Sequence, residues 1–346
     1  HNPTPIMASF KPLPDGLYPV MLTPFTQDGT EVDYECLADL TRWYVESGSA
    51  GLFPVAQSSE MYALSPDERL QCARVVKAAA GGKPVVASGT FDGTTEEQAA
   101  FINLMAKEVD VVIILVSMIC KKDESNDVWL ERVKKIIELT PGVPLGIYEC
   151  PAPYHRLLTP DMLKYLASTG RFLFTKDTSR ENTLITTKIN AIKELKDTPF
   201  RWYNGNVTTT LHSLKAGGNG YGGVSANFYP WVHAWLCANF EKEPAKAVKV
   251  QRFLTVAEMV VKTMYPASAK VYLNQEYGFP ISDKCRVRDF MFVAEDLEKL
   301  NSLKLMMEDV CAENGITPVA PKSTKSASDN LPPSKKGKTN NEDNNT

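Results

Sequence analysis

The 346-residue sequence lacks an apolar run of the roughly 18 residues that a membrane-spanning helix needs. Its first residues, His1-Asn-Pro-Thr-Pro, carry neither the charged start nor the apolar core of a signal peptide. The net charge is only -3, and no basic face interleaved with aromatic side chains is present. We therefore expect a cytoplasmic protein that binds neither membranes nor nucleic acid.

The cysteines and histidines form no pattern that is typical of a metal or disulfide site. The seven cysteines are odd in number, scattered and never spaced C-x-x-C, which favours reduced thiols in a cytosolic protein. The four histidines contain no i, i+4 pair, so we expect no zinc site and no metal cofactor. These residues are Cys36, Cys72, Cys120, Cys150, Cys237, Cys285 and Cys311, with His1, His155, His212 and His233.

What the sequence does contain is a repeated rhythm of an apolar run, a turn and an amphipathic stretch. Several of the amphipathic stretches begin with helix-capping residues, such as Ser65-Pro-Asp-Glu and Thr94-Thr-Glu-Glu. Strands that are apolar throughout, each followed by a helix, indicate a parallel sheet covered on its faces. The apolar runs are 17–22, 51–55, 84–88, 109–116, 144–148, 172–175, 200–204 and 220–225.

Eight such units match a (β/α)₈ TIM barrel in count and spacing. A doubly wound open sheet is the alternative, and the lack of a G-x-G-x-x-G motif after the first strand weakens it. After Pro230 the pattern becomes helical only, and from Pro318 the composition is that of a disordered segment. We predict an α/β fold with an N-terminal extension (1–15), a barrel (16–229), a C-terminal helical appendix (230–317) and a disordered tail (318–346).

The stretch FTKDTS places Lys176 at the end of the apolar run 172–175. In a barrel, the C-terminal ends of the strands face the active-site mouth. Tyr148 ends the neighbouring strand, a hydroxyl-rich turn at 56–60 follows the second strand, and Asn206 follows the seventh. We therefore expect an amine, a phenol and several small polar groups to converge on one opening.

Such a set suits covalent catalysis on a carbonyl group. Burial disfavours the charged form of a lysine and lowers its pKa, and the neutral amine of Lys176 would then attack a ketone to form an iminium. A phenol such as Tyr148 would supply the proton transfers. Ser58 and Ser59 would form an anion-binding nest for a substrate carboxylate.

Each candidate also has a purely structural interpretation. Lys176 would snorkel to the barrel rim or pair with Asp177, and Tyr148 would pack in the core with one satisfied hydroxyl. The remaining candidates are Gln57, Ser58, Ser59, Asn206 and Gly222. The two serines would only cap a turn, and the glutamine would have no specific contact. The asparagine would stabilise a loop, and the glycine would let two backbone segments approach closely.

The same motifs carry a family resemblance that spans roughly residues 16–310. PVMLTPFTQDGTEVD, AQSSEMYALSPDER, YECP, TKDTS and GGNGYGGVSANFYP follow one another in the order of the motifs of the dihydrodipicolinate synthase/N-acetylneuraminate lyase family. The sequence thus resembles the class I, Schiff-base-forming, pyruvate-dependent aldolases. The resemblance implies that Lys176 forms the Schiff base, that Tyr148 relays protons, and that the protein is a homotetramer or homodimer.

The sequence departs from the family pattern at the carboxylate site. Gln57 and Ser58 stand where the family has two hydroxyl residues that bind the carboxylate, and Ala56 and Ser59 replace the flanking glycines. We keep Gln57, Ser58 and Ser59 as predicted substrate-binding residues, together with Asn206 and Gly222.

Two further departures concern the relay and the second substrate. The segment 116–118 lacks the tyrosine that the family takes from a neighbouring subunit, and Pro153 replaces the arginine of dihydrodipicolinate synthases. We therefore predict a cofactor-free lyase or aldolase for pyruvate or a related 2-oxo acid, with dehydration of a sugar-derived oxo-acid as a close variant, and not an authentic dihydrodipicolinate synthase. The alternative is a 2-oxo-acid-binding barrel of reduced activity that serves as a sensor or scaffold.

Overall fold

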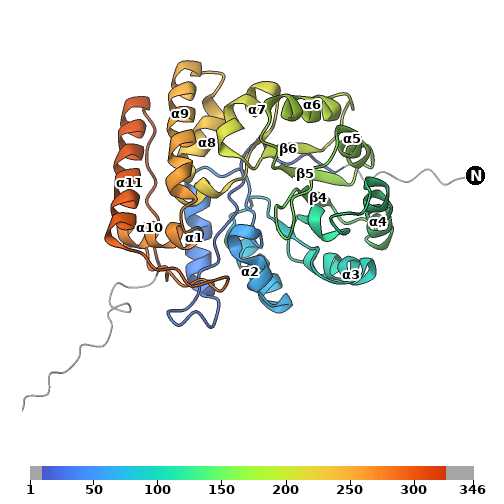
Figure 1. Ribbon diagram of the computed structural model, residues 1–346, viewed down its shortest axis with the longest axis horizontal. Helices are drawn as coiled ribbons and strands as arrows, with labels where there is room; N and C mark the ends of the chain where they lie inside the picture. Colours follow the sequence, from blue (N-terminus) through green and yellow to red (C-terminus); the bar gives the residue numbers. More distant parts are fainter. Residues whose placement is uncertain (1–9, 325–346) are drawn as a thin grey trace, which may run out of the picture.

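The protein folds around a curled, fully parallel sheet (Figure 1). The computed structural model describes residues 10–324. Within this range seven strands lie in the order β1-β7-β6-β5-β4-β3-β2. The strands are β1 (Gly16–Leu17), β2 (Val86–Ser88), β3 (Val111–Leu115), β4 (Leu145–Tyr148), β5 (Phe172–Asp177), β6 (Arg201–Asn204) and β7 (Gly220–Tyr221).

The two edges of the sheet are linked through the second apolar run of the sequence. Isolated parallel bridges join Val20 to Phe53 on one side and Leu52 to Val85 on the other. This run was predicted to be a regular strand, but it carries only these bridges, so residues 10–324 contain seven regular strands rather than eight. Val55 has a φ of 53°, which ends the extended conformation before a ladder can form. The predicted parallel α/β architecture is confirmed, and the count of eight regular strands is wrong.

Helices alternate with the strands along the chain and surround the sheet (Figure 1). The predicted start signals are confirmed. The Ser65 hydroxyl accepts a hydrogen bond from the Glu68 N–H, and Thr94 does the same with Glu97. The surrounding helices are α1 (Tyr34–Glu46), α2 (Pro66–Ala79), α3 (Thr95–Met105), α4 (Asn126–Leu139), α5 (Pro160–Ser168), α6 (Asn182–Lys193) and α7 (Thr210–Ala216).

Apolar side chains fill the interior of the curled sheet. Every residue of β3 is buried, as expected for a strand covered on both faces. Aromatic rings occupy the centre, where Phe174 stacks on Tyr203 with 4.6 Å between ring centroids and Tyr18 packs against both. The interior is therefore a packed core, which leaves the C-terminal ends of the strands as the place for a cavity.

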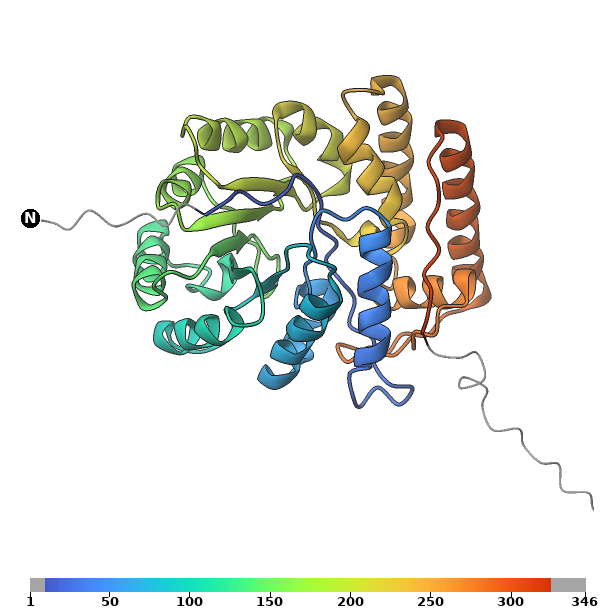
Figure 2. The same ribbon diagram turned by 180° about the vertical axis from the view of Figure 1, so that it is seen from behind.

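The chain continues after the sheet as four helices: α8 (Pro230–Asn239), α9 (Pro244–Val261), α10 (Ala267–Tyr277) and α11 (Ala294–Asn314). Helix α8 packs against β1 and β7, whereas α11 packs against α9 and α10 at the outer side of the molecule (Figure 2). Between α10 and α11 the chain runs without helix through residues 278–293. No helix among residues 10–324 combines the length and apolar character needed to cross a bilayer.

The first residues of the predicted tail are packed against α1. The Trp43 indole donates to the Val319 carbonyl at 2.6 Å, and the Thr324 N–H donates to the buried Asp39 carboxylate at 2.8 Å. The prediction of disorder from residue 318 is therefore wrong for 318–324, because a buried carboxylate needs donors that this segment supplies. The rest of the predicted tail lies outside the described residues, as do residues 1–9.

Candidate active site

Lys176 and Tyr148 lie side by side at the C-terminal ends of β5 and β4. They are paired in the register of the two strands, and the Lys176 Nζ atom lies 4.3 Å from the centroid of the Tyr148 ring. Both are almost fully buried, with 4% and 3% of their surfaces exposed. A Cβ atom at Gly205 would lie 3.0 Å from Lys176 Cε and 2.8 Å from the Asp177 carbonyl oxygen. The absence of a side chain at Gly205 therefore leaves space for the Lys176 side chain.

Burial sets the protonation of both groups. It lowers the pKa of the Lys176 amine to about 7, and the opposing influence of Cys150 is smaller. Burial also raises the pKa of the Tyr148 phenol well above its ordinary value. Near neutral pH the site therefore holds a lysine that is partly in its nucleophilic form beside a phenol that keeps its proton.

The two side chains open onto a cavity of about 350 Å³. This volume suits a small organic molecule. Four predicted site residues line the cavity together, because the turn after the second apolar run brings Gln57 and Ser58 opposite Lys176 and Tyr148. The remaining lining residues are Glu60, Val224, Tyr265, Pro266 and Val287.

Three predicted substrate-binding residues do not line the cavity. The Ser59 hydroxyl donates to the Met21 carbonyl at 2.6 Å, so it ties the turn to the sheet. The Asn206 and Gly222 N–H groups both donate to Asn204, the first to its side-chain oxygen and the second to its carbonyl. These residues hold the loops around the mouth together, and their role in substrate binding stays a prediction.

Glu60 joins the mouth to the C-terminal part of the chain. Its buried carboxylate accepts from Lys270 Nζ at 2.9 Å and from the N–H groups of Arg286 and Val287 at 2.6 and 3.1 Å. The backbone at Arg286 and Val287 is thereby fixed beside the opening, and Val287 becomes part of the cavity wall. The sequence analysis missed this wall, because no local pattern around residue 287 indicates a contact with residue 60.

Tyr265 is a second lining residue that sequence reasoning missed. It precedes α10, and its hydroxyl accepts a hydrogen bond from Asn227 Nδ2 at 2.7 Å. It also lies within hydrogen-bonding reach of Ser58. The helical appendix therefore contributes a phenol to the same cavity that contains Tyr148.

A buried charge cluster lies behind the paired strand ends. Lys188 of α6 donates to Glu149 and Asp177 at 2.6 Å each. Burial, reinforced by the neighbouring Asp177, raises the pKa of Glu149 to about 7. These acids directly follow Tyr148 and Lys176 in sequence, so the cluster fixes the backbone that carries both. Asp177 pairs with Lys188, and the structural alternative of a Lys176–Asp177 pair is excluded.

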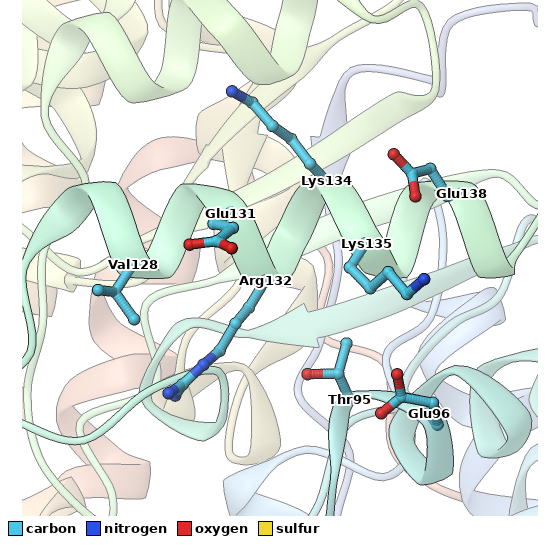
Figure 3. A pocket seen from close by; sticks show the side chains of 8 residues that line it. All are labelled: Thr95, Glu96, Val128, Glu131, Arg132, Lys134, Lys135 and Glu138. Atoms are coloured by element: carbon cyan, nitrogen blue, oxygen red, sulfur yellow. The ribbon is translucent and has the colours of Figure 1, made fainter.

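A larger groove lies elsewhere, on the surface between α3 and α4 (Figure 3). It measures about 560 Å³, and long charged side chains dominate its lining. The residues are Thr95, Glu96, Val128, Glu131, Arg132, Lys134, Lys135 and Glu138. It contains no buried nucleophile, so the cavity at Lys176 is the better candidate despite its smaller size. Among residues 10–324, no three His, Cys, Asp or Glu side chains are grouped to hold a metal ion.

The sheet is curled and parallel, and a desolvated lysine lies at the C-terminal end of one strand. These two features define a class of protein, the α/β barrels that carry a lysine amine in the mouth formed by the strand ends. The sequence profile described as the dihydrodipicolinate synthetase family matches residues 13–303. The chain belongs to this family, and the predicted resemblance is confirmed. It is accordingly an enzyme, a lyase of the class I aldolase type.

Individual relatives differ in activity. The 4-hydroxy-tetrahydrodipicolinate synthase of Haloarcula marismortui is 29% identical over 235 residues, which cover 66% of this chain and 74% of that protein. A catalytic-lysine mutant of the Ruminococcus gnavus sialic acid aldolase has the same fold, with a TM-score of 0.75, 17% identity and coverage of 86% and 97% of the two chains. The prophage protein YagE of Escherichia coli K12, in complex with pyruvate, has a TM-score of 0.72, 21% identity and coverage of 86% and 98%.

Proposed function

We propose that the protein is a Schiff-base-forming lyase or aldolase that acts on pyruvate or a related 2-oxo acid. The observation that carries the proposal is the unpaired, desolvated Lys176 amine beside Tyr148 in a small cavity. Two relatives add support, since one sialic acid aldolase has a catalytic lysine and YagE binds pyruvate.

The chemistry begins when the neutral Lys176 amine attacks the carbonyl carbon of the 2-oxo acid. Tyr148 donates its proton to the carbonyl oxygen, so that a carbinolamine forms, and loss of water then leaves an iminium. The iminium withdraws electrons from the adjacent carbon, which permits a carbon–carbon bond to break or form there. Lys176 thus supplies the nucleophile, and Tyr148 supplies the proton for formation of the carbinolamine.

Gln57 and Ser58 are the proposed partners of the substrate carboxylate. The Gln57 side-chain oxygen already accepts from the Cys150 thiol at 3.8 Å, so its amide nitrogen is the group left to donate. The Ser58 hydroxyl lines the same wall. An amide and a hydroxyl replace the two hydroxyls of the family pattern with donors of similar reach.

We further propose that aspartate semialdehyde is a poor second substrate. Pro153 has no donor where dihydrodipicolinate synthases have an arginine. The nearby Arg156 is engaged elsewhere, because its guanidinium donates to the Glu124 carbonyl at 2.6 Å and to Asn126 at 3.1 Å. It does not line the cavity, whose outer wall includes the apolar side chains of Val224 and Val287. An uncharged or hydroxylated aldehyde fits this wall better than a carboxylate does.

The test of the Schiff base is incubation of the full chain with pyruvate, reduction with borohydride and peptide mass mapping. The adduct is expected on Lys176, and the equally buried Lys188 and Lys270 are internal controls because carboxylates hold both. Lys176→Ala should abolish the adduct while the fold is kept. An unmodified Lys176 in the presence of saturating 2-oxo acids would contradict the proposal.

The test of the second substrate compares aspartate semialdehyde with uncharged aldehydes, each supplied with pyruvate. Charge-assisted hydrogen bonds contribute about 1.5–3 kcal/mol each. The loss of a bidentate pair should therefore lower kcat/KM for the semialdehyde by about two to four orders of magnitude relative to a dihydrodipicolinate synthase. Rapid turnover of the semialdehyde that Arg156→Ala abolishes would show that Arg156 has moved into the site.

A further inference from the structure

The proposed chemistry needs a route for protons between Tyr148 and solvent. Tyr148 gives up a proton when the carbinolamine forms, and the phenolate must regain one before the next turnover. Tyr148 is only 3% exposed and lines the cavity that the bound substrate would occupy. A route through neighbouring side chains would serve while the substrate is in place.

A thiol and a second phenol extend from Tyr148 toward the surface. Cys150 follows two residues after Tyr148, and its thiol is within hydrogen-bonding reach of the Tyr148 hydroxyl. The Cys150 Sγ atom lies 3.9 Å from the Tyr62 hydroxyl oxygen. Tyr62 itself is 40% exposed, so this residue lies at the surface end of the series.

The Tyr62 hydroxyl is held in place by the loop around it. It donates to the Ala152 carbonyl at 2.9 Å, and the Ser117 hydroxyl donates to the same carbonyl at 2.7 Å. The ring packs edge-on against Phe91. Tyr62 and Ser117 thus share one acceptor, which fixes the Tyr62 phenol beside the loop that follows Cys150.

We propose that Tyr62 and Cys150 relay protons between Tyr148 and solvent within a single chain. The inference rests on the proposed function. When Tyr148 loses its proton to the substrate oxygen, the Cys150 thiol supplies a proton to Tyr148, Tyr62 supplies one to Cys150, and water supplies one to Tyr62. The reverse order returns the proton, and no electron is gained or lost.

Two further features fit this relay. Burial raises the pKa of the Cys150 thiol, so the thiol keeps the proton that it has to pass on. Its S–H group donates to Gln57 Oε1 at 3.8 Å in the structure. Thiol hydrogen bonds are weak, so rotation about the Cβ–Sγ bond moves the donor toward Tyr148 at little cost.

The test uses the full chain with pyruvate and follows exchange of the methyl hydrogens in heavy water, together with borohydride trapping. Tyr62→Phe should slow the exchange by about 10–100-fold, a fraction of the usual effect of a lost acid–base group. The amount of Lys176 adduct at saturating pyruvate should stay unchanged. Small buffer acids such as imidazole should restore part of the rate, which a merely structural role would not permit. Cys150→Ala should behave in the same way, and Cys150→Ser should retain most of the rate.

The chain offers a matched control in Tyr154 and Cys120, whose hydroxyl oxygen and sulfur also lie 3.9 Å apart but which do not line the cavity. Tyr154→Phe should leave the exchange rate unchanged. A wild-type rate in Tyr62→Phe, or an equal loss in Tyr154→Phe, overturns the relay while the trapped Lys176 adduct preserves the proposed function. Absence of the Lys176 adduct from the wild-type chain overturns both.

Discussion

Three lysines are buried in the described part of the chain, and their surroundings give them different roles. Lys188 lies between two carboxylates, and Lys270 pairs with Glu60. Lys176 has no carboxylate partner in the structure, and its amine faces an aromatic ring and a cavity instead. Burial without a counter-charge is costly, and it favours the neutral form that a nucleophile needs.

The protonation of Lys176 predicts how the reaction depends on pH. Only the neutral amine attacks a carbonyl, and burial lowers the pKa of this amine to about 7. The initial rate of adduct formation with pyruvate should therefore rise with pH from about 5.5 and level off above about 8. Quenched-flow trapping between these values checks the profile. A rate that keeps increasing toward the ordinary lysine pKa of about 10.4 would contradict a desolvated amine.

At the scale of elements, the Lys188 cluster connects α6 to the ends of β4 and β5. The two carboxylates that it neutralises follow Tyr148 and Lys176 directly, so one helix fixes the backbone beneath both reactive side chains. The Thr178 N–H also donates to Glu149 at 2.9 Å, which joins the loops after the two strands. The relative position of Tyr148 and Lys176 therefore depends on a cluster that does not face the cavity.

Lys188→Met should destabilise the fold strongly. It leaves Glu149 and Asp177 buried beside each other without a cation, and breaking a buried pair in this way costs about 3–5 kcal/mol in the free energy of unfolding. Denaturant titration measures the change. The control is Lys164→Met, which removes a solvent-exposed ion pair with Glu194 and should cost less than about 1 kcal/mol. Equal effects of the two substitutions would show that the cluster does not stabilise the strand ends.

On the scale of the whole molecule, two C-terminal segments return to the barrel. The segment 278–293 is held by Glu60 at Arg286 and Val287, the second of which lines the cavity, and residues 318–324 contact α1. Helix α11 lies between these two segments, so the chain contacts the barrel on both sides of this helix (Figure 2). The cytoplasmic location and the homotetrameric or homodimeric state stay predictions.

Truncation after Val319 should lower the stability. It removes Ser323 and Thr324, whose donors satisfy the buried Asp39 carboxylate, and each hydrogen bond to a charged group contributes about 1.5–3 kcal/mol. Since Asp39 gains water after truncation and keeps Arg42, we expect a loss of about 1–3 kcal/mol in the free energy of unfolding. A chain that ends at residue 326 keeps these contacts and is the control. Equal stability of the two truncated chains would show that the segment does not stabilise α1.

The sequence by itself determined the features that depend on local order. Apolar runs and capping residues recur with the period of strand and helix, so they predicted the parallel α/β architecture and the helix starts at Ser65 and Thr94. The ends of parallel strands meet at one edge, so the motif positions alone brought Lys176 and Tyr148 together. Only the second run failed as a strand, because the positive φ of Val55 is a backbone property that periodicity does not reveal.

Only the tertiary structure decided what surrounds this pair. Tyr62 and Cys150 are 88 positions apart, and Glu60 and Arg286 are 226 apart, yet these contacts form the proposed relay and hold the cavity wall. Ser59 was predicted to bind substrate from its position in a hydroxyl-rich turn, but the direction of its hydroxyl depends on the packing of that turn against the sheet. Contacts between residues distant in sequence leave no periodic signal, because they arise only when the whole chain has folded.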